Sequence, residues 1–198
     1  MGDSQTMLAV LAGGRAERMG GEKAGVLLAG RPLISYPLAA AREAGLETVV
    51  VAKRTTRLGP LEERVLIEPE EPSHPLCGML AALDFAASRS PVPGVLFVAC
   101  DMPFLTARLL RAMANLDGAV LTEVGGRIQP LPARAEARHR SALSDSLTAN
   151  SSLRTALGAL QPHVIGEAEL ARFGQPERLC ASINSPAELA EAERALAG

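Results

Sequence analysis

Short apolar runs alternate along the whole chain with longer segments that carry helical spacing. Four of these runs are bounded by turn residues or polar positions, which is typical of buried strands. They are Met7–Leu11, Thr48–Ala52, Val65–Ile67 and Val95–Ala99. Such strands separated by helical segments predict βαβ units around a mostly parallel sheet.

The helical segments begin and end at residues that favour helix boundaries. The segments before the C-terminal one are Pro32–Ala44, Leu76–Ser88, Thr106–Leu116, Ala135–Leu147 and Ser152–Leu160. Pro32 suits a first turn, Gly45 suits the position after a last turn, and Thr106 is placed to cap its helix. The run Ser185-Pro186-Ala187-Glu188 combines a cap, a first-turn proline and a capping-box acid, so the last helix is expected to begin there.

One hairpin interrupts the alternation of strands and helices. Ala119–Glu123 and Arg127–Leu131 flank the dipeptide Gly125-Gly126, which favours a tight turn between antiparallel strands. We therefore expect one antiparallel strand in an otherwise parallel sheet, and a short last strand near Val164. Because 198 residues without a repeat or a linker suit one core, the sequence predicts a single α/β domain over 1–198 with a Rossmann-like three-layer architecture.

Composition narrows the class of ligand. The net charge is −2 and the isoelectric point is near 6.0, so the chain has no basic footprint for nucleic acid. With no tryptophan and one tyrosine, base-stacking platforms for single strands are not expected either. No apolar stretch reaches the length of a membrane span. A small anionic ligand fits better than a polymer or a membrane.

The three cysteines indicate a reducing compartment. Cys77, Cys100 and Cys180 are odd in number and widely spaced, which argues against a disulfide framework and against a C-x-x-C metal site. The chain does not open with a cationic segment followed by an apolar run, so an export signal is not expected. We predict a cytoplasmic protein.

A glycine-rich segment over residues 11–23, L-A-G-G-R-A-E-R-M-G-G-E-K, follows the first predicted strand. Peptide N–H groups in such a turn point at anionic oxygens, and glycines let the ligand approach the backbone. The mononucleotide P-loop needs Gly-Lys followed by Ser or Thr, whereas Lys23 lies between Glu22 and Ala24. The spacing of Gly13, Gly14 and Gly20 also fails the dinucleotide fingerprint. The segment therefore predicts a polyphosphate loop of another kind.

Lysine usage draws attention to the end of this loop. Of the 20 basic residues only Lys23 and Lys53 are lysine, and the rest are arginine. A compact ammonium can act as a point charge between phosphates, which a forked guanidinium does less well. The alternative is a glycine-rich turn whose arginines are merely solvated.

The pattern L-A-G-G-x-x-x-R-M-G-G-x-K resembles the signature of nucleotidyltransferases that couple an NTP to a phosphorylated acceptor. Within that superfamily the chain is most similar to the molybdenum cofactor guanylyltransferase family. Further segments extend the resemblance over nearly the whole chain: Pro75–Met79, Cys100–Phe104, Gln129–Leu131 and Ile183–Pro186.

The resemblance implies a nucleotidyltransferase fold and a set of site residues. The implied nucleotide-binding residues are Leu11, Ala12, Gly13, Gly14, Lys23, Glu68 and Asp101. Lys23, Arg18 and Asp101 are the implied catalytic residues. Asp101 is also the implied ligand of Mg²⁺, a hard cation that prefers carboxylate oxygen and lets substrate phosphates complete its shell. Asn184 is either a second metal ligand or a simple turn residue before the last helix.

Some positions depart from the family pattern. His74 and Cys77 differ from the G-P-L-A-G segment that closes over the base, and His74 is expected to be a loop residue rather than a catalyst. Ala52 stands where relatives often have a nucleotide-contacting asparagine, so that contact is expected to be absent. Glu68 stands where the family usually has an aspartate that contacts the nucleotide. Glu68 is equally well explained as a solvated acidic residue in a loop.

The resemblance implies transfer of GMP from MgGTP to the phosphate of molybdenum-bound molybdopterin, with molybdopterin guanine dinucleotide and pyrophosphate as products. Gly13-Gly14 favours guanine, because cytidylyl-transferring relatives usually have L-A-A-G there. The alternatives are a cytidylyltransferase for the same cofactor, a guanylyltransferase for a cobinamide-type phosphate, and a catalytically silent nucleotide-binding partner in cofactor insertion. A transient complex with cofactor-biosynthesis or acceptor proteins is also expected.

Overall fold

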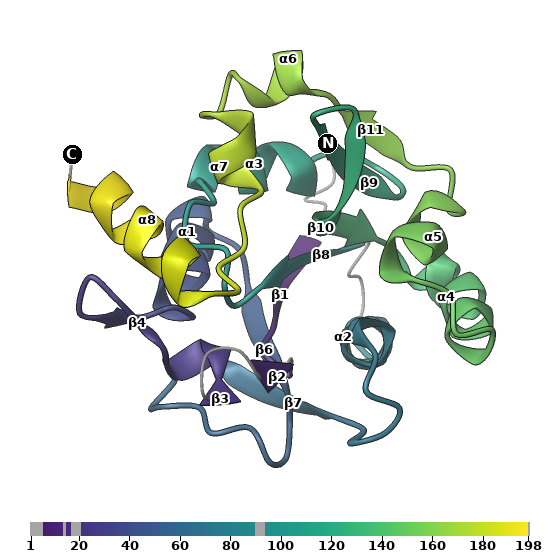
Figure 1. Cartoon of the computed structure of the whole chain (residues 1–198). Helices are drawn as coiled ribbons and strands as arrows, with labels where there is room; N and C mark the ends of the chain where they lie inside the picture. Colours follow the sequence, from purple (N-terminus) through teal and green to yellow (C-terminus); the bar gives the residue numbers. More distant parts are fainter. Residues whose placement is uncertain (1–5, 14, 17–20, 90–93, 198) are drawn as a thin grey trace.

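A seven-stranded sheet forms the centre of the protein (Figure 1). The structure is a computed structural model that describes residues 6–13, 15–16, 21–89 and 94–197. In spatial order the strands are β11 (His163–Ile165), β9 (Val120–Val124), β10 (Arg127–Ala135), β8 (Gly94–Ala99), β1 (Thr6–Leu11), β6 (Thr48–Lys53) and β7 (Arg64–Glu68). Two small ribbons accompany the sheet: β2 (Arg15–Ala16) with β3 (Gly21–Glu22), and β4 (Leu27–Leu28) with β5 (Arg31–Pro32).

Strand β10 alone runs against the direction of the other six. It pairs antiparallel with both β8 and β9, whereas β11 is parallel to β9, and β1, β6, β7 and β8 are parallel to one another. The expected mostly parallel sheet with one antiparallel strand is confirmed. Because the four parallel strands β8, β1, β6 and β7 end at the same edge, the residues that follow them meet there, where open α/β sheets bind ligands.

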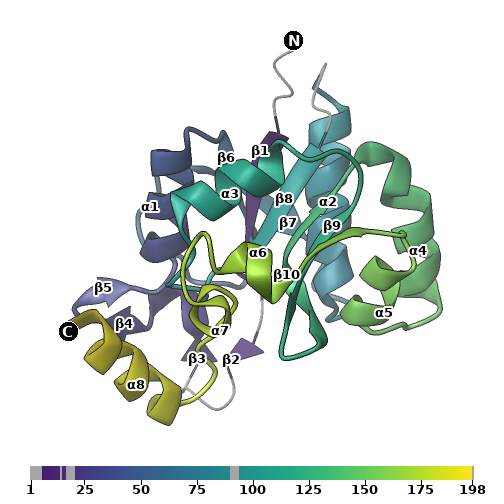
Figure 2. The ribbon, with the colours of Figure 1, turned by 90° about the horizontal axis from the view of Figure 1, so that it is seen from above.

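Helices cover both faces of the sheet and give the predicted three layers (Figure 2). One face carries α1 (Ser35–Ala44), α3 (Ala107–Ala114), α6 (Glu167–Leu170) and α7 (Pro176–Leu179). The other face carries α2 (Pro75–Ala87), α4 (Arg140–Thr148) and α5 (Leu153–Gly158). The remaining helices of the described residues are α8 (Pro186–Ala197) and the 3₁₀ turns η2 (Lys23–Gly25) and η3 (Ala137–His139). Among the described residues, no helix is both long and apolar enough to cross a membrane.

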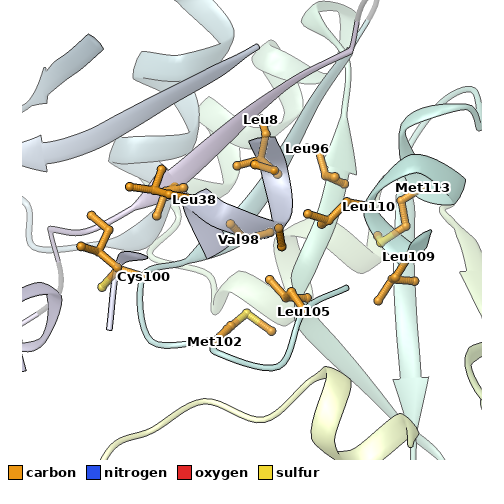
Figure 3. Close-up of a cluster of buried hydrophobic side chains, with 14 of the residues drawn as sticks. Leu8, Leu38, Leu96, Val98, Cys100, Met102, Leu105, Leu109, Leu110 and Met113 are labelled. Atoms are coloured by element: carbon orange, nitrogen blue, oxygen red, sulfur yellow. The ribbon is translucent and has the colours of Figure 1, made fainter. Parts of the chain in front are cut away.

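Alternation along the buried strands divides the core into two apolar clusters. In β1, Leu8 and Val10 face the α1 and α3 side, whereas Met7 and Ala9 face the α2 side. Figure 3 shows the first cluster, in which strand, loop and α3 side chains pack together. The expected alternation of strands and helices therefore follows from burial on both faces of the sheet.

A third, smaller cluster lies beside the sheet and joins segments that are far apart in the sequence. Leu28 and Leu33 around the β4–β5 ribbon pack with Ile183 and Ala192 of the C-terminal region. Phe104, which follows β8, packs against the same cluster. The cluster thereby holds the chain after β3, the chain after β8 and the start of the C-terminal helix next to one another.

Two expected helix starts are wrong. Pro32 belongs to β5, because residues 27–32 form a tight ribbon with Ala29 and Gly30 at positive φ, and α1 begins only at Ser35. Ala135 ends β10, where it pairs with Val95, and α4 begins at Arg140 after a 3₁₀ turn. In both places strand pairing with another segment takes residues that local spacing assigned to a helix.

The Thr106 cap predicts a measurable loss of stability on mutation. The Thr106 hydroxyl accepts a hydrogen bond from the backbone N–H of Leu109 at 3.3 Å, as the sequence predicted for the start of α3. Thr106→Ala should lower the free energy of unfolding by about 1 kcal/mol and the melting temperature by roughly 2–4 °C. Thr148→Ala on exposed α4 is the control, since its hydroxyl bonds only to the carbonyl of Ser144 within the helix. Equal melting temperatures for the two variants would contradict the capping role.

Candidate active site

Asp101 lies at the carboxyl end of β8, in the tight turn that leads toward α3. Met102 donates a backbone hydrogen bond to the carbonyl of Ala99 in this turn, and the Asp101 side chain is 6% exposed. The backbone N–H of Ile183 donates to the Asp101 carbonyl at 3.0 Å. This bond fixes the segment before α8 against the end of β8.

Lys23 reaches Asp101 from the end of the glycine-rich segment. Its ammonium lies 2.6 Å from Oδ2 of Asp101 and also donates to Oδ1 of Asn184. The Asn184 amide donates from Nδ2 to the carbonyl of Ser182 at 3.1 Å, which turns its oxygen toward Lys23. Three residues that span the chain from position 23 to position 184 thus converge on one point.

The two oxygens of the Asp101 carboxylate differ in their contacts. Oδ1 is buried and accepts no hydrogen bond from any residue that the structure describes, whereas Oδ2 pairs with Lys23. A buried unpaired carboxylate oxygen is costly, so it points to a ligand that is part of the working site. Together with Oδ1 of Asn184 it offers the hard oxygen atoms that Mg²⁺ prefers. In the part of the chain that the structure describes, no group of three or more His, Cys, Asp or Glu side chains is placed to hold a metal ion.

A cavity of about 330 Å³ opens beside this point along the carboxyl edge of the sheet. It is lined by Leu11, Gly13, Lys23, Lys53, Glu68, Ser73, His74, Pro75, Ala99, Cys100, Asp101, Leu131 and Leu153. The lining combines apolar walls with two ammonium groups and two carboxylates, the mixture expected of a site for a charged organic ligand.

Gly13 and Gly78 are the glycines that make room for the Glu68 carboxylate. A Cβ atom added at Gly13 would lie 1.7 Å from Oε1 of Glu68, and one added at Gly78 would lie 2.7 Å from Oε2. Neither distance is sterically possible without movement of the acid. Glycine at these two positions therefore lets the carboxylate lie between the first loop and the first turns of α2.

Glu68 is buried at the end of β7 and is not a solvated loop acid. Burial raises the pKa of Glu68 above its usual value of 4.5, the nearby Lys53 ammonium opposes this rise, and Glu70 adds to it. Lys53 is also buried and lies opposite Glu68 in the register of β6 and β7. Sequence reasoning assigned no role to Lys53, although its rarity as one of two lysines was a usable signal.

The wall formed by the start of α2 is fixed by His74. Its Nδ1 accepts a hydrogen bond from the backbone N–H of Leu76 at 3.1 Å, so His74 caps α2. Its Nε2 lies 3.0 Å from the carbonyl of Ser151, which connects α2 to the turn before α5. Nearby, Cys77 donates to the carbonyl of Pro72, and burial raises the pKa of its thiol. The two departures from the family segment thus serve as structural contacts of this wall.

The structure gathers most of the predicted site residues. Five of them line the cavity: Leu11, Gly13, Lys23, Glu68 and Asp101. Asn184 contacts the cavity-lining Lys23 through a hydrogen bond. The structure buries Ala12 and hydrogen-bonds its N–H to the carbonyl of Val51, so its part in the site is through the backbone. Gly14 and Arg18 lie outside the described residues.

Two further segments, one in β10 and one at the start of α5, contribute a leucine each to the cavity wall. In the segment Gln129–Leu131 of β10, Leu131 lines the cavity, whereas the Gln129 amide donates to the carbonyl of Arg127 within the same strand. Leu153 also lines the cavity and was not predicted. An apolar residue at the start of a helix gives no sequence signal of such a role, because only the packing of α5 places it there.

Comparison with known proteins gives consistent matches. The model of the MobA-like NTP transferase domain matches residues 8–164. Molybdenum cofactor guanylyltransferase of Cereibacter sphaeroides is 32% identical over 196 residues, which cover 94% of this chain and 95% of that protein. The enzyme of the same name from Serratia proteamaculans is 36% identical over 115 residues, 57% of this chain and 56% of that protein.

A solved structure shares the fold. Molybdopterin-guanine dinucleotide biosynthesis protein A from Archaeoglobus fulgidus superposes with a TM-score of 0.78 over 97% of this chain and 99% of that chain. Its sequence identity is 22%, so this likeness supports the architecture. It agrees with the α/β class expected from the alternation of strands and helices.

The raised pKa of Glu68 predicts a stabilising substitution. The Glu68 carboxyl has a higher pKa in the folded than in the unfolded state, where it is near 4.5. The folded protein therefore becomes less stable as the pH rises from 4.5 through the pKa of the folded state. Glu68→Gln should therefore raise the melting temperature at pH 8, by about 2–4 °C for each ~1 kcal/mol of desolvation relieved. The gain should shrink at acidic pH, where Glu68 takes up its proton.

Thermal melts of both proteins between pH 4 and pH 8 measure this difference. Glu43→Gln on the exposed surface of α1 is the matched control and should change little. A lower melting temperature for Glu68→Gln at pH 8 would show that unrecognised contacts outweigh the cost of burying the charge.

Proposed function

The chain belongs to the MobA-like NTP transferase family, and on this premise we propose that it transfers GMP from MgGTP to the terminal phosphate of molybdenum-bound molybdopterin. The products are molybdopterin guanine dinucleotide and pyrophosphate. The family match agrees with the resemblance carried by the glycine-rich segment and by Cys100–Phe104. We propose that residues 1–198 act as one nucleotidyltransferase domain.

One observation carries the proposal: Lys23, Asp101 and Asn184 meet at the carboxyl edge of the sheet beside the cavity. An ammonium, a carboxylate and an amide oxygen at one point form a polar centre suited to a metal–phosphate group. The apolar walls of the cavity suit the organic remainder of a nucleotide. A catalytically silent nucleotide-binding protein would need the walls of the cavity to bind the nucleotide, but it would not need this polar centre.

The nucleotide is proposed to lie along the first loop and the neighbouring strand ends. Leu11 and Gly13 line the cavity, and Gly13 has no side chain to block the approach of a ligand. By the family resemblance Ala12 and Gly14 are proposed to belong to the same nucleotide-binding loop, and Glu68 to contact the nucleotide further along the edge. Lys23 and Arg18 supply positive charge to the phosphates. These positive charges would offset repulsion between the anionic acceptor and the triphosphate during transfer.

Asp101 and Asn184 are proposed to hold the magnesium ion. The unpartnered Oδ1 of Asp101 and the amide oxygen of Asn184 fit a hard cation. When bound, magnesium neutralises phosphate charge and polarises phosphoryl oxygens. In the structure Lys23 pairs with the other carboxylate oxygen, Oδ2 of Asp101, and with the same Asn184 oxygen, so its ammonium would move toward the phosphates for Asn184 to accept a cation.

The transfer itself makes few demands on acid–base side chains. A phosphate monoester has a second pKa of about 6, so the acceptor is largely anionic at neutral pH. Its oxygen forms a bond to the α-phosphorus of GTP while the bond from that phosphorus to the pyrophosphate oxygen breaks. The protein's contribution is therefore alignment and compensation of charge rather than proton removal.

The cytoplasm is the proposed location of this reaction. Cys77, Cys100 and Cys180 are free thiols, which suits a reducing compartment. A transient complex with proteins of cofactor biosynthesis or with an acceptor enzyme is part of the same proposal, because the dinucleotide product must be handed over. Pull-down with cofactor-loaded acceptor enzymes addresses that part separately.

A turnover assay tests the proposed reaction. Purified protein with MgGTP and molybdenum-bound molybdopterin should release pyrophosphate and form the guanine dinucleotide, and Asp101→Asn should reduce kcat by about 100-fold or more. Glu43→Gln is the control for the loss of one exposed carboxylate. Unchanged turnover in Asp101→Asn would contradict the metal role, and product formed only from CTP would favour the cytidylyltransferase alternative.

The position of Lys23 predicts an unusual effect on metal binding. Lys23→Met removes the ammonium that pairs with Asp101 and Asn184, so the nucleotide-free protein should bind Mg²⁺ about tenfold more tightly than wild type. The same variant should bind GTP less tightly, because a phosphate contact is lost. Calorimetric titration with MgCl₂, and melting temperatures with and without MgCl₂, measure the first effect. A smaller Mg²⁺ response in the variant would show that Lys23 does not occupy the cation position.

A further inference from the structure

The cavity extends past Asp101 to the β10 side of the sheet edge. On that side it is lined by Leu131 of β10 and by Leu153 at the start of α5. In the strand order, β10 lies on one flank of β8, and β1, β6 and β7 lie on the other. With the nucleotide proposed to lie along β1, β6 and β7, the phosphate acceptor is directed toward Leu131 and Leu153.

The imidazole of His74 joins α2 to the turn that precedes Leu153. A backbone N–H can only donate and a carbonyl can only accept, so the two ring nitrogens must differ. Nδ1 accepts from the N–H of Leu76 at 3.1 Å, and Nε2 therefore carries the proton and donates to the carbonyl of Ser151 at 3.0 Å. One neutral tautomer of His74 thus satisfies both contacts.

The Ser151 carbonyl belongs to a turn whose shape is fixed on both sides. At the end of α4, Asn150 has a positive φ of 51°, and the N–H of Ser151 donates to the carbonyl of Ser146 at 2.9 Å. This is the pattern of a Schellman motif. At the start of α5, the Ser152 hydroxyl accepts from the N–H of Thr155 at 3.1 Å. The imidazole bond then fixes the place of this turn relative to α2, which lies on the same face of the sheet as α4 and α5 (Figure 1).

We propose that His74 is a positioning residue for the phosphate acceptor: its bond to Ser151 holds Leu153 in place as the acceptor-side wall. This inference rests on the nucleotidyl transfer proposed for the same cavity. Loss of the bond frees the turn between α4 and α5 and leaves the polar centre at Asp101 untouched. The wall must then become ordered when the acceptor binds, which weakens acceptor binding without slowing the chemical step. Glycine, which the family segment G-P-L-A-G has at this position, offers neither ring nitrogen.

Two amide variants separate the roles of the two ring nitrogens. In His74→Asn the amide oxygen can replace Nδ1 as the cap of α2, but the side chain is too short to reach Ser151. In His74→Gln the amide N–H₂ can replace Nε2 as the donor to Ser151, but the cap is left unfilled. The first variant therefore lacks only the bond between the two walls, and the second lacks only the helix cap.

Steady-state kinetics of GMP transfer measure the effect on the acceptor. His74→Asn should raise the KM for the acceptor about fivefold, the contribution of one neutral hydrogen bond, with kcat and the KM for MgGTP within about twofold of wild type. His74→Gln should keep the acceptor KM of wild type, and its melting temperature should fall by about 2–4 °C because the cap is lost. An equal acceptor KM in the two variants would overturn the positioning role.

Hydrogen exchange reports on the same bond without any substrate. The backbone amides of α5 and of the turn before it should exchange about fivefold faster in His74→Asn than in His74→Gln. His163→Asn, which removes an exposed imidazole from β11, is the matched control and should change neither the exchange nor the acceptor KM. Equal exchange in the two His74 variants would show that the bond does not hold the turn, and would overturn the inference.

The two measurements separate failure of this inference from failure of the proposed function. If wild type transfers GMP and the acceptor KM does not rise in His74→Asn, the positioning role is wrong and the transferase proposal stands. If wild type forms no dinucleotide while exchange still distinguishes the two variants, the transferase proposal is wrong, and so is the assignment of this wall to the acceptor.

Discussion

The buried charge of Asp101 is the constraint around which the site is organised. A carboxylate taken out of water is unfavourable unless a cation and hydrogen-bond donors meet it. Lys23 supplies the cation, and the segment before α8 supplies the neighbouring Asn184 and the backbone bond from Ile183 to Asp101. The requirement to compensate one carboxylate thus draws together an early loop, a strand end and the last helix.

Apolar packing makes that convergence rigid. The cluster of Leu28, Leu33, Ile183 and Ala192 lies beside the sheet, and Phe104 packs against it four positions after Cys100. The Arg178 guanidinium stacks 4.6 Å from the centre of the Phe104 ring and donates to a carbonyl in α8. Apolar packing and this cation–π contact together therefore support the segments that carry the charged groups of the site.

The glycines of the site act through the space they leave. Gly13 and Gly78 belong to different segments, yet a side chain at either position would collide with the same Glu68 carboxylate. Loop and helix can therefore approach the end of β7 closely, and a buried acid occupies the space between them. Glu68 at the end of β7 and Asp101 after β8 thereby line one cavity along the same edge of the sheet.

The sequence alone determined the alternating architecture, the antiparallel strand and the cap of α3, because these depend on periodicity and local hydrogen bonds. It also indicated Lys23, one of only two lysines, and Asp101 at a strand end, whereas Glu68 was indicated only by the family resemblance and was equally well explained as a solvated loop acid. Only the tertiary structure decided where Pro32 and Ala135 lie, because strand pairing with distant segments overrides local helix preference. It also decided that Glu68 is buried, that Asn184 contacts Lys23 and that Lys53 faces the cavity. These outcomes depend on which strands become neighbours, and strand order is set by packing of the whole core rather than by any local pattern of residues.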